Sequence, residues 1–336
     1  MANYKDIKGT TVQVKSSTQP TTYPQIAGEL YYNSSNGDYE FLSPGVGTWA
    51  SGGNVNQSRS HGGGAGATQT AALFFGGNNP PTNTMADKTE SYNGTSWTEV
   101  NELNVAAIYI TGTGTQTAAQ VAGGNRPSDN HSQKNEIFDG TNWAEDADLN
   151  TGRNGVILFG TSTASFGCNG HVPPTYQTKV ESWNGTSWTE TTDTNYGRYG
   201  GMGAGTTAGG LVFGGEGPGS MPVDQQNTEK WDGSSWTEVG DMNTTRSWCW
   251  SGGTTNDDAV TAGGQPHSAN TETWNGTSWT ETNNLSAAKA YASGKCGTGS
   301  DSLYVSGATA PPTADNRTAV TEEWTLAHSV KTVTTS

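Results

Sequence analysis

Polar and hydrophobic positions alternate along this chain in a short pattern that returns at a regular interval. The pattern is ten residues long and is clearest at 181–190, ESWNGTSWTE, where two Trp residues alternate with polar ones. Related copies lie at 90–99, 136–145, 229–238 and 272–281, and the second aromatic residue recurs every 43 to 48 residues. A fixed period of this length indicates a repeat architecture.

Each ten-residue copy predicts a β-hairpin. Its centre is Asn-Gly or Asp-Gly, a pair that tolerates positive φ and favours a tight turn between two strands. The flanking Glu-x-aromatic and Trp-x-Glu stretches have the alternation typical of short strands. We expect the aromatic side chains to be buried and both Glu residues to stay in water. One hairpin cannot bury its own apolar face, whereas several stacked copies can.

Two further strands are predicted between successive hairpins. A segment of small residues, often containing Arg, leads into a Gly/Ala/Thr-rich strand, and an apolar strand ending in Gly-Gly follows, as at 73–77 and 211–215. A variable loop then leads to the next hairpin. Each unit therefore has four strands, here named a, b, c and d. No segment shows a sustained 3.6-residue apolar period, so we expect almost no helix.

The order of these features resembles the kelch repeat of β-propellers. Gly-Gly follows strand b, an aromatic residue lies in strand c and a Trp lies in strand d, over residues 47–326. The c–d connection is one residue shorter than in the usual kelch pattern, and Gly-Gly is lost in two units, which are degenerate at 165–168 and 304–307. The resemblance implies four-stranded antiparallel blades arranged around an axis.

Counting the repeat residues predicts how the ring closes. The strand d Trp residues and the last strand c aromatic residue are Trp49, Trp97, Trp143, Trp188, Trp236, Trp279 and Trp324. The propeller segment therefore begins with a d strand and ends after a c strand. We predict an all-β propeller of six four-stranded blades, closed by pairing of the strand near Trp49 with the strand near Trp324, because closure removes an exposed sheet edge. A ragged sixth blade, or a seventh built from 29–41 and 330–336, are the alternatives.

The same count divides the chain into parts. We predict an extended N-terminal arm with a hairpin over 1–45, the propeller over 46–328 and a C-terminal tail over 329–336. The N-terminal 17 residues contain no apolar run, so we expect neither a signal peptide nor a transmembrane helix.

Composition narrows the partners that we expect. The chain has 336 residues, 47 Gly and a formal net charge of −15. This charge argues against a nucleic-acid backbone or an anionic membrane as the partner. The three Cys residues lie far apart in sequence, which argues against a disulfide framework and against a zinc site.

Four arginines and two glycine-rich segments invite a chemical interpretation. Six-bladed sialidases use several Arg residues to hold a carboxylate, but here the four share one repeat position, so we expect a structural ring. They are Arg59, Arg153, Arg198 and Arg246. The segments 62–66 and 201–205 resemble phosphate loops but match no nucleotide fingerprint, so we expect them to be strand a.

The b–c loops are the candidate binding surface. They vary in length and sequence and contain ten of the 13 Pro residues, which stiffen a loop. Binding residues usually lie on loops held by a rigid scaffold. Our candidate contacts are Arg126, Asp129, His131, His171, Tyr176, Glu216, Asp224, His267 and Arg317. The three His residues among them lie in equivalent loops, where a shared metal or glycan site is the alternative to ordinary surface histidines. We expect no catalytic residue, no cofactor and no metal.

A second resemblance concerns residues 26–37, IAGELYYNSSNG, which are similar to short segments in structural proteins of tailed phages, especially marine ones. It implies a non-enzymatic virion protein (a tail fibre, tail appendage or capsid decoration) made in the host cytoplasm and present in several copies per particle. Its arm would dock on other virion proteins, and its propeller would present the b–c loops to a host-surface glycan or protein, without contacting nucleic acid or inserting into a membrane. The alternatives are a glycan-processing enzyme, either a sialidase-like hydrolase or a kelch-type oxidase, and a cellular kelch scaffold that binds another protein.

Overall fold

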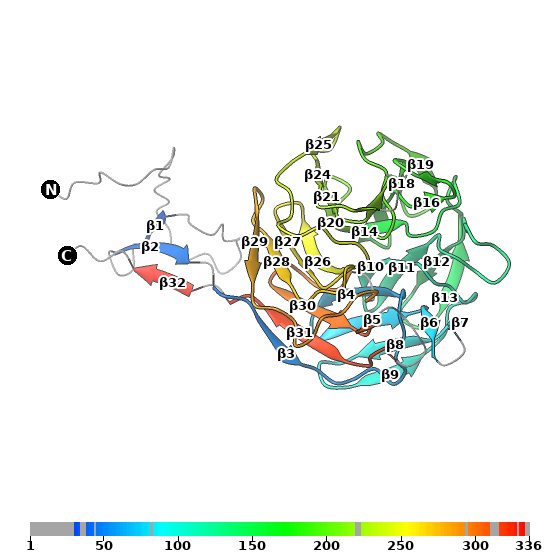
Figure 1. The fold of residues 1–336 in the computed structure, drawn as a ribbon, viewed down its shortest axis with the longest axis horizontal. Helices are drawn as coiled ribbons and strands as arrows, with labels where there is room; N and C mark the ends of the chain where they lie inside the picture. The colour runs from blue at the N-terminus through cyan, green and yellow to red at the C-terminus, as the bar shows by residue number, and fades with distance from the viewer. Residues whose placement is uncertain are drawn as a thin grey trace. The chain divides into compact units, whose positions relative to one another are not determined.

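The computed structural model describes residues 30–33, 38–43, 45–80, 83–218, 223–292, 295–309, 316–327 and 329–332. These residues form β-strands and their connections, with no helix among them. The chain divides into two units, one comprising 48–325 and the other 1–47 together with 326–336. The larger unit is a six-bladed β-propeller, in which the sheets follow one another around an axis (Figure 1).

Five blades are four-stranded antiparallel sheets whose strands follow chain order from the inner to the outer edge. Blade 1 contains β4 (Gly63–Thr68), β5 (Ala71–Phe75), β8 (Thr89–Tyr92) and β9 (Trp97–Val100). Blade 2 contains β10 (Gly112–Thr115), β11 (Ala118–Ala122), β12 (Asn135–Phe138) and β13 (Trp143–Asp146). Blade 3 contains β14 (Ile157–Thr161), β15 (Ala164–Cys168), β18 (Val180–Trp183) and β19 (Trp188–Glu190). Blade 4 contains β20 (Met202–Thr206), β21 (Gly209–Phe213), β24 (Thr228–Trp231) and β25 (Trp236–Glu238). Blade 5 contains β26 (Trp250–Thr255), β27 (Asp258–Ala262), β28 (Thr271–Trp274) and β29 (Trp279–Thr282).

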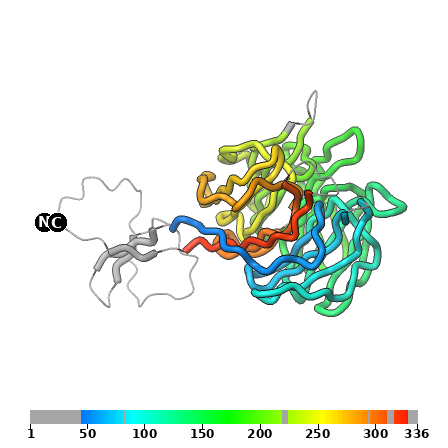
Figure 2. Tube along the Cα trace, turned by 60° about the horizontal axis from the view of Figure 1, so that its bottom comes forward, coloured from blue at the N-terminus to red at the C-terminus, as the bar shows by residue number. Residues whose placement is uncertain are grey.

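Blade 6 joins the two ends of the propeller. It contains β30 (Asp301–Val305), β31 (Thr321–Thr325) and β3 (Thr48–Ser51), and its inner edge is marked by an isolated bridge between Gly297 and Ser302. Strand β3 pairs antiparallel with β31, so that Trp49 lies opposite Trp324. Figure 2 shows this pairing as the blue start of the propeller running beside its red end. The predicted closure near Trp49 is therefore confirmed.

One aromatic pair stabilises each blade. The strand c aromatic residue lies directly opposite the strand d Trp, as in Trp183 and Trp188, whose ring centroids are 5.3 Å apart. Both rings are buried because they pack against residues of the preceding blade, among them Ala122 and Leu149. Most of the strand d indoles also donate a hydrogen bond to the preceding blade: Trp143 Nε1 donates to Thr89 Oγ1 at 3.0 Å, and Trp49 Nε1 donates to Thr271 Oγ1 at 3.0 Å. Trp49 thus has the same role in blade 6 as the other strand d Trp residues.

The first Glu of each hairpin is buried, so the expectation that both Glu residues stay in water is wrong. Glu181, for example, is fully buried, and its Oε1 accepts a hydrogen bond from Arg153 Nη2 at 2.8 Å. Arg153 Nη1 also donates to the carbonyls of Asn169 and Lys179. The equivalent pairs are Arg59–Glu90, Arg198–Glu229 and Arg246–Glu272. The four arginines are therefore a structural ring, as the sequence predicts, and removing one partner of such a pair would leave a buried charge unpaired.

The small unit contains a three-stranded sheet. Strand β1 (Leu30–Asn33) pairs with β2 (Asp38–Ser43), and β2 pairs with β32 (Ser329–Thr332). The hairpin predicted over 29–41 is thus present, and a strand of the predicted C-terminal tail joins it. The extended arm predicted over residues 1–28 lies outside the described residues.

Candidate functional site

Six equivalent residues, one from each blade, lie around the axis at the start of strand a. They are His61, Tyr109, Gly155, Gly200, Trp248 and Tyr291, and all have positive φ, between 50° and 65°. Backbone hydrogen bonds connect neighbours from different blades: Trp248 N donates to Gly200 O at 2.7 Å, Tyr291 N to Trp248 O at 2.8 Å and His61 N to Tyr291 O at 3.0 Å. Positions far apart in the sequence are therefore gathered at one point.

Aromatic side chains pack together at this end of the axis. The His61 ring centroid lies 4.4 Å from that of Tyr291, 4.7 Å from that of Tyr109 and 5.2 Å from that of Trp248. Tyr199, the residue before Gly200, packs edge-on against Trp248 at 4.6 Å. We call these five residues the aromatic cluster. His61 and Trp248 are 6% and 8% exposed, whereas the three tyrosines are half-buried and present part of their rings to solvent.

Two glycines make room for the cluster. A Cβ atom at Gly155 would lie 2.5 Å from the Tyr199 ring, and one at Gly200 would overlap the Trp248 ring. Ordinary van der Waals contact requires more than 3 Å. The other four positions of the central ring have an aromatic or His side chain. At Gly155 and Gly200 the neighbouring rings of Tyr199 and Trp248 occupy that space instead.

The b–c loops surround this cluster because strands a and b run antiparallel, which brings the start of a and the end of b to the same end of the blade. The residue after Gly-Gly pairs with the residue before the central ring, as in Asn154 with His171 and Tyr199 with Glu216. Three of the loops contain short hairpins, formed by β6 (Asn78–Asn79) with β7 (Thr84–Met85), by β16 (His171–Val172) with β17 (Thr175–Tyr176) and by β22 (Glu216–Gly217) with β23 (Val223–Asp224). The His171 ring lies 4.8 Å from that of Tyr176 and 5.2 Å from that of Tyr199.

Two carboxylates lie at the edge of the cluster. Glu216 and Asp224 are cross-strand partners in the β22–β23 hairpin. Trp248 Nε1 donates to Glu216 Oε1 at 2.9 Å, and Ser247 Oγ donates to Asp224 Oδ1 at 2.6 Å. Burial raises the pKa of Glu216, with a further contribution from the Asp224 charge, while the Trp248 hydrogen bond opposes the increase. Burial likewise raises the pKa of Asp224.

The tyrosines around Glu216 are affected by its charge. Burial raises the pKa of Tyr109, Tyr176, Tyr199 and Tyr291, and the negative charge of Glu216 raises each of them further. Within the described ranges, no ion pair reaches either Glu216 or Asp224. The site therefore combines half-buried negative charge with phenol and indole rings.

His61, within the cluster, and His171, beside it, both have lowered pKa values. Burial, and then the nearby charge of Arg317, lowers the pKa of His61 to about 3. Burial and the charge of His131 lower the pKa of His171. The His267 ring lies 5.8 Å from the Tyr291 ring, and Gln265 Nε2 donates to the Tyr291 hydroxyl. Of the residues predicted from sequence, His171, Tyr176, Glu216, Asp224 and His267 are thus brought to the cluster.

The structure places Arg126 elsewhere, and its selection as a surface contact is wrong. Arg126 is 2% exposed, and its Nη1 donates to Glu136 Oε1 at 2.5 Å and to Val105 O at 3.1 Å. In blade 2 the position of the repeated arginine is occupied by Ala107. Arg126 reaches back from the b–c loop and supplies the missing guanidinium.

The three remaining candidates, Asp129, His131 and Arg317, are not members of the cluster. Asp129 is exposed and its Oδ1 accepts a hydrogen bond from His131 N at 3.0 Å, which orders the tip of the blade 2 loop. Arg317 is 9% exposed; its Nε donates to Ser60 Oγ at 3.0 Å and its Nη2 to Asn83 Oδ1 at 2.5 Å. Through Ser60, the residue before His61, Arg317 therefore supports the blade 1 side of the cluster.

The sequence interpretation missed His61, Tyr109, Tyr199, Trp248 and Tyr291. A signal for four of them exists, because they lie two residues after the position of the repeated arginine. The residue type at this position differs between blades, whereas the arginine two residues before it recurs in four of the six blades. A variable position close to a repeated one, on the loop side of the blade, is a usable pointer to a site.

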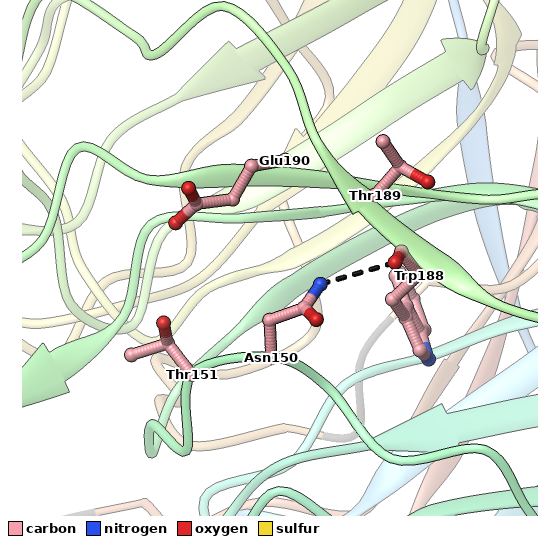
Figure 3. A pocket seen from close by; sticks show the side chains of 5 residues that line it. All are labelled: Asn150, Thr151, Trp188, Thr189 and Glu190. Carbon is pink, nitrogen blue, oxygen red and sulfur yellow. Dashed lines mark hydrogen bonds between the residues drawn. The ribbon is translucent and has the colours of Figure 1, made fainter.

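Two grooves between blades are formed by residues of the repeat and not by the aromatic cluster. One of about 410 Å³ is lined by Asn150, Thr151, Trp188, Thr189 and Glu190, and Figure 3 shows the Asn150 amide directed at the Trp188 carbonyl, to which it donates at 3.1 Å. Another, of about 340 Å³, is lined by the equivalent residues of blade 5: Asn243, Trp279, Thr280 and Glu281. Because both arise from residues that the repeat uses to hold its buried Glu, we assign them to the architecture.

The described ranges contain neither a metal-binding cluster nor a membrane-spanning helix. Within them, no three or more His, Cys, Asp or Glu side chains lie close enough to bind a metal ion together. The same ranges contain no helix of the length and hydrophobicity needed to cross a bilayer. The sequence matches no protein-family model and no curated protein.

Proposed function

We propose that this protein is a non-enzymatic binding protein that holds a carbohydrate of a cell surface on the aromatic cluster and the surrounding b–c loops. The observation that carries the proposal is the gathering of half-exposed rings from Tyr109, Tyr199 and Tyr291 at the centre of one propeller face. Ligand sites combine apolar and aromatic surfaces with a few fixed polar groups. The C–H faces of a sugar ring pack on such rings, and its hydroxyl groups pair with side chains such as Gln265 and Glu216.

We further propose that the propeller belongs to a virion protein of a tailed phage. The support is the resemblance of residues 26–37 to segments of such proteins. On this proposal the N-terminal arm docks on other virion proteins, several copies are present per particle, and the protein is a tail fibre, a tail appendage or a capsid decoration. A rigid propeller with a binding face suits host-surface recognition.

Glycan-array binding of the purified full-length chain tests the first part. We expect binding to a defined set of glycans and its loss in Tyr199→Ala, because Tyr199 contributes a half-exposed ring to the cluster. Tyr196→Ala is the matched control: Tyr196 is 40% exposed and its hydroxyl donates to Glu238, away from the cluster. An array without binding, or equal binding by the two variants, would contradict the proposal.

Mass spectrometry of purified phage particles tests the virion part. We expect peptides of this chain at a fixed copy number per particle. A low number places the protein on the tail, and a number in the hundreds places it on the capsid. Absence from particles that are otherwise complete would overturn the virion assignment and leave the binding proposal to be judged on the array.

One observation favours a second candidate, a glycan-processing enzyme. Glu216 and Asp224 are cross-strand neighbours with raised pKa values on an aromatic surface, and most glycosidases use two carboxyl groups beside the scissile bond. Incubating each array-positive glycan with the protein and analysing the products decides between the candidates. Cleavage that Glu216→Gln and Asp224→Asn abolish supports the enzyme; intact glycan supports the binding protein.

A further inference from the structure

We infer that the ligand of the aromatic cluster carries an ammonium group, which Glu216 pairs with and the surrounding rings enclose. This inference rests on the proposed binding function and names the chemical class of its ligand. The group can belong to an amino sugar or to a quaternary ammonium substituent such as choline. Both sources share a cation that an aromatic surface with a carboxylate recognises.

The charges at the site are unbalanced. Glu216 and Asp224 are neighbours, and in the part of the chain that the structure describes no ion pair reaches either of them. The nearest arginines of the repeat are already engaged, Arg198 with Glu229 and Arg246 with Glu272. A pair of half-buried carboxylates without a cation is unfavourable by itself, and a cationic ligand would relieve it.

The basic residues on the other side of the cluster, His61, His171 and Arg317, do not neutralise the negative charge of Glu216 and Asp224. Burial keeps His61 neutral at physiological pH, and the pKa of His171 is also lowered. Arg317 is directed at Ser60 and Asn83. The site therefore disfavours acidic glycans, which carry carboxylate, sulfate or phosphate groups.

The rings supply the second half of the recognition. Trp248 donates its indole N–H to Glu216, which fixes the carboxylate beside the cluster. The charge of Glu216 raises the pKa of four surrounding tyrosines, Tyr109, Tyr176, Tyr199 and Tyr291. A cation within about 6 Å of a ring centroid is attracted by the ring quadrupole, and Trp and Tyr are the strongest partners. Carboxylate and rings thus favour the same ligand group.

A matched pair of probes isolates the charge. Choline and 3,3-dimethylbutan-1-ol have the same shape, but only choline is charged, and its charge does not depend on pH. We would titrate each into the full-length protein and follow the Trp248 indole N–H resonance, assigned with Trp248→Phe. We expect choline to shift this resonance and to bind at least tenfold more tightly than the neutral alcohol. Equal affinity, or tighter binding of the alcohol, would overturn the inference.

Two variants show where the preference originates. Glu216→Gln should reduce the choline preference at least tenfold, because it removes the paired charge and keeps the shape. Glu99→Gln makes the same change at an exposed position of β9 and should leave the preference intact. An unchanged preference in Glu216→Gln, or the same loss in both variants, would overturn the assignment to Glu216.

Oligosaccharides distinguish the sources of the ammonium group and separate this inference from the proposed function. Chitosan tetramer and fully N-acetylated chitotetraose share a backbone and differ in charge, and tetragalacturonate is the acidic counterpart. Tighter binding of chitosan tetramer favours an amino sugar, and binding of choline alone favours a quaternary substituent. If neutral or acidic glycans bind and Glu216→Gln has no effect, the inference fails while the glycan-binding proposal stands. If no glycan binds and choline shifts nothing, both fail.

Discussion

Trp49 and Trp324 face each other across β3 and β31 with their ring centroids 5.1 Å apart, and they come from opposite ends of the propeller. In blades 3, 4 and 5 the equivalent Trp pair is formed within one hairpin, at 5.3, 5.4 and 5.5 Å. The sixth pair therefore reproduces the local geometry of the repeat with residues that only meet when the ring closes.

This pair predicts a sharp boundary for truncation. Deletion of 1–47 should leave a cooperative propeller, whereas deletion of 1–51 also removes β3 and exposes the edge of β31. Trp49→Ala in the full chain should cost about 3 kcal/mol of unfolding free energy, at the low end for a buried Trp because Trp49 is only half-buried. Differential scanning calorimetry measures all three. Equal melting temperatures for the two truncated chains would contradict closure through β3.

Arg126 predicts a compensated repeat in blade 2. Arg126→Ala should cost about 3–5 kcal/mol, because Glu136 would remain buried without its counter-charge. In the same background, Ala107→Arg should recover part of this loss, since arginine occupies the equivalent position in four other blades. Urea denaturation of the single and double variants measures the coupling.

The exposed pair between Lys134 and Glu145 is the control in the same blade. Lys134→Ala should cost about 1 kcal/mol or less, as expected for a surface ion pair. If Arg126→Ala is no more destabilising than Lys134→Ala, the buried guanidinium does not have the role that its contacts imply.

His61 predicts how stability depends on pH. Its pKa falls from 6.5 in the unfolded chain to about 3 in the fold. A depressed folded pKa means that the stabilisation is fully present above pH 6.5 and is lost as pH falls towards 3. One such group contributes a slope of up to about 1.4 kcal/mol per pH unit. His61→Asn keeps a residue type that tolerates positive φ and should flatten the slope between pH 6.5 and 5.

The window between pH 6.5 and 5 is chosen because most carboxyl groups titrate below it. The free energy of unfolding, measured by denaturant at several pH values, gives the slope. His131→Asn is the control, at a loop position outside the cluster. A slope that is the same in the wild type and in His61→Asn would show that another group is responsible.

The sequence predicted the blades because their signals are local and repeated. Asn-Gly turns, alternating aromatics and Gly-Gly each act over a few residues, and their count determines that β3 completes blade 6. The burial of the first Glu was also accessible. In Glu-x-aromatic, Glu90 and Tyr92 are two residues apart and so lie on the same face of the strand. The repeated arginine was the partner that this buried position required.

The aromatic cluster could not be predicted in the same way. Its members come from different blades, more than 40 residues apart, and no single repeat contains two central-ring residues. Their meeting point follows from the closure of the ring and the path of each d–a connection. The role of Arg126 was missed for a similar reason. Blade 2 has Ala107 at the position of the repeated arginine, and Arg126 supplies the guanidinium from the b–c loop, a different position of the repeat.

Gly200 predicts a link between backbone and site. It has a φ of +65°, and a Cβ there would overlap the Trp248 ring. Gly200→Ala should therefore displace Trp248, break its hydrogen bond to Glu216 and abolish ligand binding. Gly233→Ala is the matched control: it also has positive φ, +100°, but its nearest neighbour would be 3.5 Å away, on a turn of blade 4. Both changes should cost about 1–2 kcal/mol for the left-handed conformation. Thermal unfolding, the Trp248 indole resonance and glycan binding then separate the two effects, since only Gly200→Ala should alter the last two. Wild-type binding by Gly200→Ala would show that the position of Trp248 does not determine recognition.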